Sequence, residues 1–439
     1  MPHFEKNRRT DGWRRVVITG MGIISPLGRD PQTFWTNLLQ GKSGIQEIRG
    51  FPSATFACRI AGQVMDFQFP RELLPPSTRA RPDRRSQFAL AAAEQAFRQS
   101  GLKLEDDPAN RRAIYLGAGE GTVDLDHFAR LVAKARRQDT IPMDLFLRVG
   151  LEDCQPEDSF EIEAGLCAMH LAARYRAQGP NLNCLTACAA SSQALGEAFR
   201  RIQCGEADII ISGGAHAMIQ PLDVIGFIAL TALSSRNDNP AKASRPFDAG
   251  RDGFVLGEGA GILILEELEH ALHRGAEIHA EIIGYGSTAD AYRVTDTHPE
   301  ARGAIAAMRL ALEDAGVDPG EIDYINAHGT STVENDATET LAIKEVFGRQ
   351  AYKIPISSTK SMIGHLIAAA GAVELIACIL TLRHGIAHAT INYEIPDPLC
   401  DLDYIPDQSR KLKAETVLSN SFGFGGQNVA LVVRKFSRH

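Results

Sequence analysis

The sequence predicts an α/β protein made of two similar halves, and three observations support this. From residue 16 onward, short β-branched runs alternate with long amphipathic stretches and Gly-rich joints, the pattern of strands and crossover helices. The strand-like run 113–119, which ends in a Gly-containing loop, is echoed by the run 323–329. At 439 residues the chain also exceeds the size at which a single core stops growing. We place the boundary near Gly275, between halves of residues 1–275 and 276–439.

The first half is expected to open with a strand that ends at the glycines Gly20 and Gly22. The helices that follow are expected to end at Gly41 and Gly101, because glycine is favoured just past a helix C-terminus. The predicted elements of this half are strands over 16–19, 182–186, 207–213 and 261–265, and helices over 31–40, 86–99 and 189–203.

The second half repeats this order, with a strand over 353–358 before a helix over 365–382, and closing strands over 416–419 and 428–433. The apolar stretch 366–382 is short for a bilayer span and is interrupted by Glu374, so we expect a buried core helix there and no membrane anchor. Two segments do not follow this alternation of strands and helices, 51–76 and 124–160. They are expected to cap a pocket or to build a partner surface.

The composition argues against several classes of protein. With 46 Lys and Arg against 54 Asp and Glu, the net charge is -8, which disfavours a nucleic-acid partner. The 8 cysteines are scattered without a C-x-x-C pair, so neither a disulfide framework nor a zinc site is indicated. The first 15 residues are polar and Arg-rich and lack the apolar region of a secretory signal. We therefore expect a cytoplasmic enzyme.

Cys188 lies at the predicted turn from an apolar strand into a helix, whose free N–H groups point back at it. Such a position favours a thiolate, the species that attacks a thioester, and the N–H groups can hold the oxyanion that forms. A small buried thiol is nevertheless the commoner fate of a lone cysteine. Cys184, inside the strand, is expected to belong to the core.

Two histidines and a lysine follow predicted strands of the second half. His328 lies on a tight loop, and the run 360–365 supplies Lys360 and His365. A helix N-terminus disfavours imidazolium, so His365 is expected to be a neutral N–H donor that polarises a carbonyl. A single histidine is more often a core or surface group, but these residues and Cys188 fall at corresponding strand ends, where open α/β sheets place their sites.

The run 420–426 interleaves aromatic residues with glycines that permit close backbone approach. Its N–H groups could complete an oxyanion hole, and Phe422 and Phe424 could gate an acyl channel. A β-turn with buried phenylalanines is the alternative. The Gly-rich run 253–259 precedes a strand instead of following one, so we reject nucleotide binding there.

Five segments in the same order resemble those of the elongating β-ketoacyl-acyl-carrier-protein synthases of types I and II, in the thiolase-like superfamily. The likeness covers nearly the whole chain, through the segment around Cys188 and the segments 328–330, 360–365, 420–426 and 244–261. It implies a five-layered αβαβα fold of two duplicated halves, a homodimer and a ping-pong reaction. It also implies that no cofactor is required beyond the phosphopantetheine arm of the substrate acyl carrier protein.

The resemblance further assigns roles to individual residues. Cys188 would accept the acyl chain, with the backbone N–H groups of Cys188 and Phe424 holding the oxyanion. Malonyl thioester would then bind, and His328 and His365 would stabilise the enolate while Lys360 orders the histidines. Three further sets are implied: Thr330 and Thr332 at the pantetheine arm; Asn326, Glu374, Ser419 and Asn420 around a monovalent ion; and Arg79, Arg81, Arg84 and Arg85 at a carrier-protein docking patch, with Arg130, Lys134, Arg136 and Arg137 as further candidates.

Departures from the family pattern concern the substrate. Glu120 stands where common members carry a small or apolar residue at the depth of the acyl pocket, Gln427 replaces the usual Thr, and 124–160 is hard to align. A carboxylate disfavours a plain alkyl tail. A dedicated polyketide or specialised-lipid pathway is therefore the alternative to fatty acid biosynthesis. A non-catalytic chain-length subunit is less favoured because Cys188 is present, and a heterodimer stays open.

Overall fold

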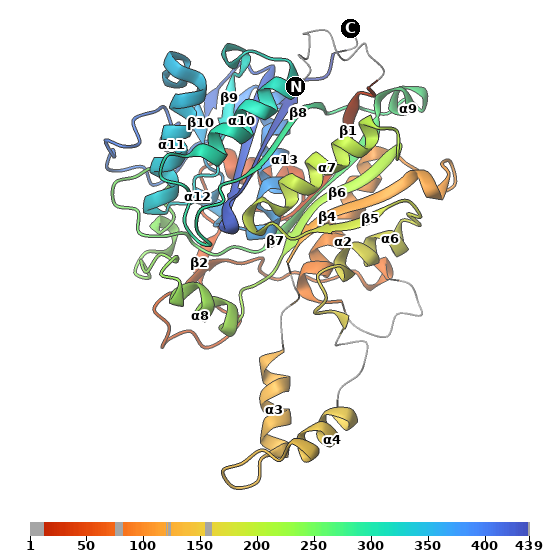
Figure 1. Ribbon diagram of the computed structural model, residues 1–439, viewed down its shortest axis with the longest axis vertical. Coiled ribbons are helices and arrows are strands. Elements are labelled where there is room, and N and C mark those ends of the chain that lie inside the picture. Colours follow the sequence, from red (N-terminus) through yellow and green to blue (C-terminus); the bar gives the residue numbers. More distant parts are fainter. Residues whose placement is uncertain (1–12, 75–81, 120, 122–123, 154–159, 438–439) are drawn as a thin grey trace.

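The computed structural model describes residues 13–74, 82–119, 121, 124–153 and 160–437. These residues form one mixed sheet of ten strands with helices on both faces (Figure 1). In spatial order the strands are β10 (Ile356–Ser357), β9 (Tyr324–Asn326), β13 (Thr416–Gly423), β14 (Gln427–Arg434), β8 (Ala280–Ala289), β1 (Val16–Ile24), β7 (Gly259–Glu267), β6 (Ile209–His216), β4 (Arg112–Ala118) and β5 (Asn181–Cys184). Two small sheets pair β2 (Ile45–Glu47) with β3 (Ile60–Gly62), and β11 (Ile386–Ala387) with β12 (Arg410–Lys411).

The large sheet has the same pattern of strand directions in its two halves. From the edge inward, β5, β4 and β6 are parallel, and β6, β7 and β1 are antiparallel. From the opposite edge, β10, β9 and β13 are parallel, and β13, β14 and β8 are antiparallel. A short antiparallel pairing of β1 with β8 joins the two units. The turn with Cys188 follows β5, and the segment with Lys360 and His365 follows β10, so reactive residues of the two halves follow corresponding edge strands, while His328 follows β9.

The helices complete five layers around the two units of the sheet. Helices α7 (Ala190–Gln203) and α13 (Ala370–His384) pack against each other and contact strands of both units. Helices α2 (Arg84–Ser100) and α6 (Leu166–Arg174) cover the outer face of the first unit, and α10 (Arg302–Ala315), with α11 (Val333–Phe347) against it, covers that of the second. This confirms the predicted α/β class and layering. The remaining helices are α1 (Pro31–Leu39), α3 (Leu125–Ala135), α4 (Met143–Asp153), α8 (Pro221–Ala229), α9 (Leu268–His273) and α12 (Lys360–Ile363).

Helix α13 is the core helix that the sequence predicts. Every residue from Ala370 to Leu382 is buried, and a side chain added at Gly371 would collide with the side chain of Ser192 of α7, so the two central helices pack closely at this point. Within the described part of the chain, one helical stretch, Ile367–His384, is long and apolar enough to cross a membrane, and 83% of it is buried inside the protein. Such burial is typical of the core helix of a globular domain.

The first strand is longer than predicted, because Gly20 and Gly22 lie inside β1 and do not end it. A Cβ at Gly20 would stand 2.1 Å from the carbonyl oxygen of Ala96, and one at Gly22 would stand 2.0 Å from that of Ala92. Both glycines therefore serve the close packing of α2 on the sheet. The predicted strand 182–186 is also shorter, since β5 ends at Cys184.

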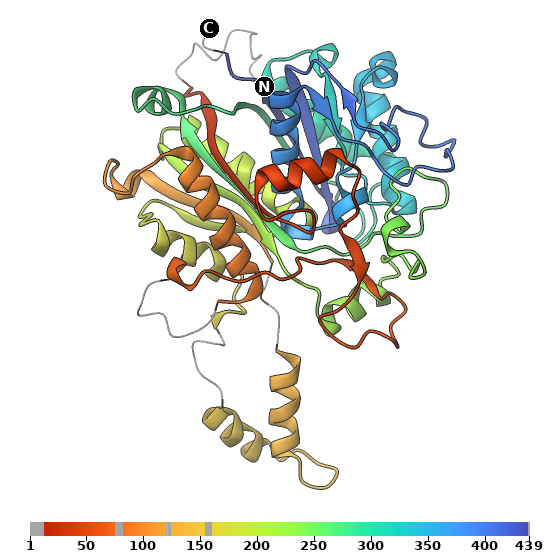
Figure 2. The same cartoon turned by 180° about the vertical axis from the view of Figure 1, so that it is seen from behind.

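The segment 124–160, predicted as an excursion, forms a helical hairpin of α3 and α4 that projects from the body (Figures 1 and 2). The rings of Phe128 and Phe146 join the two helices at 6.3 Å between centroids. None of the residues of α4 is buried, so the hairpin has almost no hydrophobic core of its own. Residues 154–159 lie outside the described residues.

A buried carboxylate anchors the first unit beside the β1–β7 pair. Glu266 accepts hydrogen bonds from Thr19 Oγ1 at 2.8 Å and from Arg274 Nε at 2.6 Å. His270 Nδ1 lies 2.6 Å from Glu266 Oε1, and its Nε2 lies 2.7 Å from Asp107 Oδ1. Hydrogen bonds to Glu266 and then to Asp107 raise the pKa of His270 from 6.5 to about 9, against the effect of burial.

We expect this imidazolium to make stability depend on pH. Because the pKa in the folded protein lies above the ordinary value, the stabilisation is complete below pH 6.5 and is lost as pH rises through about 9. The ring is partly exposed, so we expect a contribution of about 1–2 kcal/mol. Unfolding temperatures of the wild type and His270→Gln should therefore differ at pH 6 and converge by pH 9.5. An equal difference at both pH values would refute this assignment.

Candidate active site

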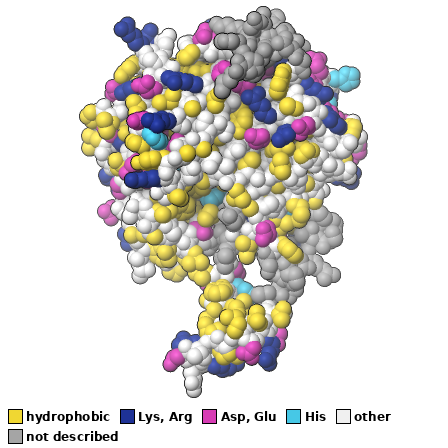
Figure 3. All heavy atoms as spheres, viewed as in Figure 1, with side chains coloured by type: hydrophobic (Ala, Val, Ile, Leu, Met, Phe, Trp, Pro, Cys, Tyr) yellow, Lys and Arg dark blue, Asp and Glu magenta, His cyan; other side chains and the backbone are white. Residues whose placement is uncertain are grey.

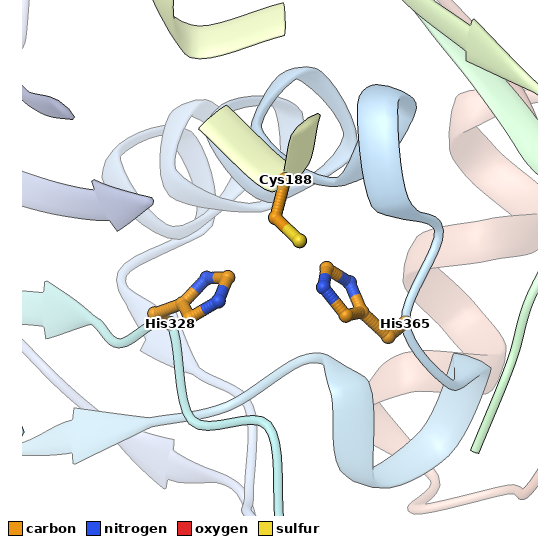
Figure 4. A group of neighbouring side chains, drawn as sticks. All are labelled: Cys188, His328 and His365. Carbon is orange, nitrogen blue, oxygen red and sulfur yellow. The ribbon is translucent and has the colours of Figure 1, made fainter. Parts of the chain in front are cut away.

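Three reactive side chains from the two halves meet in one place. Cys188 lies in a single turn of helix, Ala187–Ala189, that leads into α7. His328 follows β9, and His365 follows α12. The sulfur atom and one nitrogen of each ring all lie within 4.8 Å of one another, and all three side chains are buried. Figure 4 shows the thiol and the two rings pointing toward one another.

The turn that carries the nucleophile is sharp. Ala187 adopts a φ of 46°, a left-handed conformation that costs a non-glycine residue energy and is typical of functional turns. On the opposite side, a Cβ at Gly423 would stand 3.1 Å from the backbone nitrogen of Cys188, so glycine lets the 422–425 loop approach closely. The thiol therefore lies between the start of α7 and the end of β13.

The sulfur of Cys188 rests as a thiol. Burial raises the pKa of Cys188 to about 11, although the N–H groups of Phe424 and Cys188 and the ammonium of Lys360 act in the opposite direction. The expectation that its position alone favours a thiolate is therefore wrong for the resting protein, because loss of solvent outweighs the N–H groups. Those groups nevertheless point at the place where an oxyanion would form.

Both histidines present an N–H group from the same ring position. Lys360 Nζ lies 3.3 Å from His328 Nδ1, and the backbone N–H of Ile367 donates to His365 Nδ1 at 3.3 Å. A neutral ring that accepts at Nδ1 carries its proton on Nε2. Burial, followed by the charge of Lys360, holds the pKa of both imidazoles well below its usual range. His365 is thus neutral through burial more than through a helix terminus.

Lys360 and Glu374 form an ion pair inside the protein. The ammonium donates to Glu374 Oε1 of α13, and each side chain is only 1% exposed. Burial raises the pKa of Glu374, and the neighbouring Lys360 opposes this shift. Removing either partner of such a pair leaves an isolated buried charge, at a cost of about 3–5 kcal/mol. Lys360 therefore connects the central helix α13 to His328.

Two acids that the sequence analysis missed hold the histidine loop in place. Glu339 accepts the backbone N–H groups of His328 and Gly329, each at 2.8 Å, and burial raises the pKa of Glu339 to about 7. Asp336 accepts the backbone N–H groups of Phe247 at 2.7 Å and Ser331 at 3.2 Å. The signal that could have found them is two acids three residues apart on the helix that follows the loop.

A cavity of about 260 Å³ leads to these groups and is lined by Cys188, His328 and His365. Thr330, Thr332, Phe422 and Phe424 also line it. The two threonine hydroxyls lie 2.8 Å apart. The rest of the lining combines apolar side chains with three carboxylates: Leu230, Ala232, Phe254 and Ile367, and Asp252, Asp296 and Glu334. The structure thus brings Cys188, both histidines and the predicted pantetheine and gate residues around one cavity, whereas Lys360 is not part of its lining.

A second group of predicted residues carries side-chain oxygens without hydrogen-bond partners. The side chains of Asn326, Glu374, Ser419 and Asn420 are buried, and each has one oxygen without a hydrogen-bond partner among the described residues: Asn326 Oδ1, Glu374 Oε2, Ser419 Oγ and Asn420 Oδ1. The amide nitrogens face away, toward Thr359 for Asn326 and Glu339 for Asn420. A set of oxygen donors with no N–H among them fits a hard cation.

The predicted docking arginines differ in their exposure and in their hydrogen-bond partners. Arg84 donates twice to Glu258, at 2.8 and 2.7 Å, and remains 39% exposed. Arg85 is buried and donates to the carbonyl oxygens of Glu161 and Glu163, so the expectation that it lies on an exposed patch is wrong. Arg79, Arg81 and the acyl-pocket residue Glu120 lie outside the described residues. The exposed basic candidates of the hairpin are Arg130, Lys134, Arg136 and Arg137.

Comparisons with known proteins agree with this geometry. Residues 13–271 match the model of the β-ketoacyl synthase N-terminal domain, and residues 279–394 match that of the C-terminal domain. Among curated proteins, the chain is 45% identical to 3-oxoacyl-[acyl-carrier-protein] synthase 2 of Synechocystis sp., over 96% of this chain and 98% of that protein. It is 44% identical to the enzyme of the same name from Coxiella burnetii, over 96% and 99% of the two chains.

Solved structures give the same answer. A β-ketoacyl synthase from Burkholderia phymatum superposes with a TM-score of 0.85 at 33% identity, over 97% of this chain and all of that one. A ketosynthase complex with a type II PKS acyl-carrier protein, AntDE:AntF, gives a TM-score of 0.84 at 38% identity, over 97% and 100%. With both domain models matched in order across most of its length, the chain belongs to the β-ketoacyl synthase family.

Proposed function

We propose that this protein is a 3-oxoacyl-[acyl-carrier-protein] synthase, a cytoplasmic acyltransferase that forms carbon–carbon bonds in fatty acid biosynthesis. The observation that carries the proposal is one buried thiol within 4.8 Å of two neutral imidazoles in a single cavity. Curated relatives at 44–45% identity over nearly the full chain bear that name.

In the first step Cys188 attacks the thioester of an acyl carrier protein. The sulfur–carbonyl bond forms, the pantetheine thiol leaves, and the proton of Cys188 ends on that leaving thiol. The backbone N–H groups of Cys188 and Phe424, which face the sulfur, hold the oxyanion of the tetrahedral intermediate. The high pKa of the buried thiol means that its proton must leave as the bond forms.

In the second step a malonyl thioester loses carbon dioxide. The Nε2–H groups of His328 and His365 donate to the thioester carbonyl oxygen, so the enolate that forms is held by two N–H donors in a dry pocket. Its carbon attacks the acyl-Cys188 carbonyl, the Cys188 thiolate is expelled, and one proton from solvent restores the thiol. Lys360 donates toward His328 Nδ1 and so keeps the single N–H proton of that neutral ring on Nε2.

The substrate supplies the only prosthetic group that this reaction needs, the phosphopantetheine arm of the carrier protein. Thr330 and Thr332, whose hydroxyls line the cavity, can bind its amide groups. A carrier protein is acidic, so docking needs basic side chains. The exposed Arg130 of α3 is a candidate, and Arg84 and Lys134 are less available because Glu258 and Asp153 already bind them.

We further propose a monovalent cation at the oxygens of Asn326, Glu374, Ser419 and Asn420. When bound, such an ion would supply positive charge beside the Lys360–Glu374 pair and stabilise the buried carboxylate. The support is that all four free oxygens are buried and lack hydrogen-bond partners among the described residues.

We propose that the protein assembles as a homodimer through the edge strand β5 and the hairpin. Exposed strand edges and large exposed apolar patches mark interfaces. Leu182 and Leu185 at the edge are 48% and 55% exposed. Met143, Leu147 and Leu151 share one face of α4 with exposures of 65%, 59% and 85%. Figure 3 shows apolar side chains gathered on the projecting hairpin.

A ketosynthase of a polyketide or specialised-lipid pathway is the second candidate. Its support is that one similar structure is a type II PKS ketosynthase complex and another is the ishigamide ketosynthase/chain length factor, at 36% identity and a TM-score of 0.85. The second of these also keeps a heterodimer open. A non-catalytic partner subunit is disfavoured, because Cys188 and both histidines are in place.

The condensing reaction predicts separable defects. Intact mass after mixing with acyl-carrier-protein thioesters should show an adduct on the wild type and on Cys204→Ala, which removes an exposed thiol, but none on Cys188→Ala. His328→Ala and His365→Ala should still be acylated, yet release carbon dioxide from malonyl-carrier protein about 100–1,000-fold more slowly, since each loses one donor to the enolate. An adduct on Cys188→Ala, or none with any donor on the wild type, would contradict the proposal.

The cation site predicts an ion-specific stabilisation. The unfolding temperature should rise with KCl relative to choline chloride at equal ionic strength, because only K⁺ can bind the four oxygens. Ser419→Ala removes one free oxygen and should raise the half-saturating K⁺ concentration severalfold. Ser212→Ala is the matched control, a buried serine of β6 whose Oγ likewise lacks a partner among the described residues. Equal melting in both salts would rule the site out.

The dimer predicts that charge on the hairpin separates the subunits. Leu151→Asp should shift the mass by light scattering from twice 47.7 kDa toward 47.7 kDa, since an unpaired carboxylate would be buried at the interface. Leu310→Asp is the control, because Leu310 is a 44% exposed leucine on the outer helix α10. A wild type that runs as a monomer would exclude the homodimer.

A further inference from the structure

A buried polar network lies behind the catalytic residues and takes no part in the steps above. At its centre is His388, in the loop after β11, which is completely buried. Its Nε2 lies 3.2 Å from Tyr324 Oη, 3.2 Å from Thr359 Oγ1 and 3.4 Å from Asn326 Nδ2. Ser357 Oγ lies 3.3 Å from the same ring. Four side chains therefore converge on one imidazole.

The hydrogen bonds fix the tautomer of this ring. His388 Nδ1 lies 3.0 Å from the carbonyl oxygen of Ala389, which can only accept, so Nδ1 carries the proton. In the neutral ring Nε2 is then the acceptor. Every polar hydrogen that surrounds Nε2 must come from its four neighbours, Tyr324, Ser357, Thr359 and Asn326.

This acceptor decides which way the amide of Asn326 points. Its nitrogen, which can only donate, lies 3.0 Å from Thr359 Oγ1 and 3.4 Å from His388 Nε2. With the amide reversed, Asn326 Oδ1 would face the lone pair of His388, and two acceptors would meet in a dry interior. The oxygen is therefore turned to the opposite side, where it lacks a partner among the described residues.

The side-chain amide of Asn420 is oriented in the same way, by an acceptor that faces its nitrogen. Asn420 Nδ2 donates to Glu339 Oε1 at 3.1 Å, so Asn420 Oδ1 is left over as well. One acceptor behind each amide thus leaves both side-chain oxygens without a hydrogen-bond partner among the described residues, as Glu374 Oε2 also is.

We propose that His388 is a positioning residue for the monovalent cation, acting through Asn326. Its acceptor nitrogen holds the amide so that the oxygen faces the ion, and it also holds the hydroxyl of Thr359, the residue before Lys360. His388 touches neither substrate nor ion. The inference rests on the proposed function only for its effect on catalysis, because the effect on ion binding is independent of any acyl substrate.

The test is a K⁺ titration of the unfolding temperature of the full-length protein, with choline chloride holding the ionic strength constant. His388→Leu removes the acceptor and should raise the half-saturating K⁺ concentration at least tenfold. Ser357→Ala is the matched control: it removes one hydroxyl from the same network, leaves the contact between His388 and Asn326, and should stay within about threefold of the wild type. An unchanged half-saturation in His388→Leu, or a wild type without a K⁺ response, would overturn the proposal.

A second variant covers the case in which His388→Leu does not fold. In His388→Gln the side-chain oxygen can accept from Asn326 as Nε2 does, so half-saturation within about threefold of the wild type supports the acceptor role, and a tenfold rise refutes it. Acylation of Cys188 and decarboxylation of malonyl-carrier protein are measured on the same samples. We expect the His388→Leu defect in decarboxylation alone, corrected in part by high K⁺. Absence of acylation in the wild type would instead defeat the condensing function and leave the K⁺ result standing.

Discussion

The ion pair between Lys360 and Glu374 is the constraint on which the rest of the site depends. Taking each charge out of water costs several kcal/mol, and that cost is offset only if the partners stay together. Glu374 is the one acid in the buried stretch 370–382 of α13, at the centre of the molecule, and Lys360 begins α12. The pair therefore fixes the distance between the central helix and the loop before His365. Because the same ammonium faces His328, the pair also helps to hold the ring of His328.

Much of the fold could be predicted because its signals are local. Alternation of β-branched runs with amphipathic stretches identified the parallel strands, and glycines such as Gly41 and Gly101 marked helix ends. Local sequence patterns cannot reveal which helix or strand packs beside a given element. Gly20 and Gly22 were interpreted as a strand end, whereas they make room for the backbone of α2. Likewise β5 is an edge strand with only four residues, a fact set by its neighbours and not by its own sequence.

The candidate site, like the fold, has features that could be predicted from the sequence and features that could not. Cys188, His328 and His365 could be proposed from their places after strands, because topology alone brings such loops together. The pKa values and charge states of the site residues could not be predicted, since burial is a property of the folded chain. Burial keeps Cys188 as a thiol and places Arg85 beneath the surface. It also encloses the hydrogen bonds by which Glu339 holds the loop with His328. The role of His388 is a further case, because its only signal is a set of partners that are distant in sequence.

The central position of β1 has a consequence for biosynthesis. This strand is made first, and all nine of its residues are buried, yet its two neighbours are β7, which ends at Glu267, and β8, which begins at Ala280. Ribosomes add about 5–20 residues per second, so β1 waits on the order of 10–50 s before either partner leaves the exit tunnel. During that time an apolar segment is exposed. Nascent chains should thus depend on chaperones during translation, and slow codons before residue 267 should increase aggregation more than slow codons after residue 290.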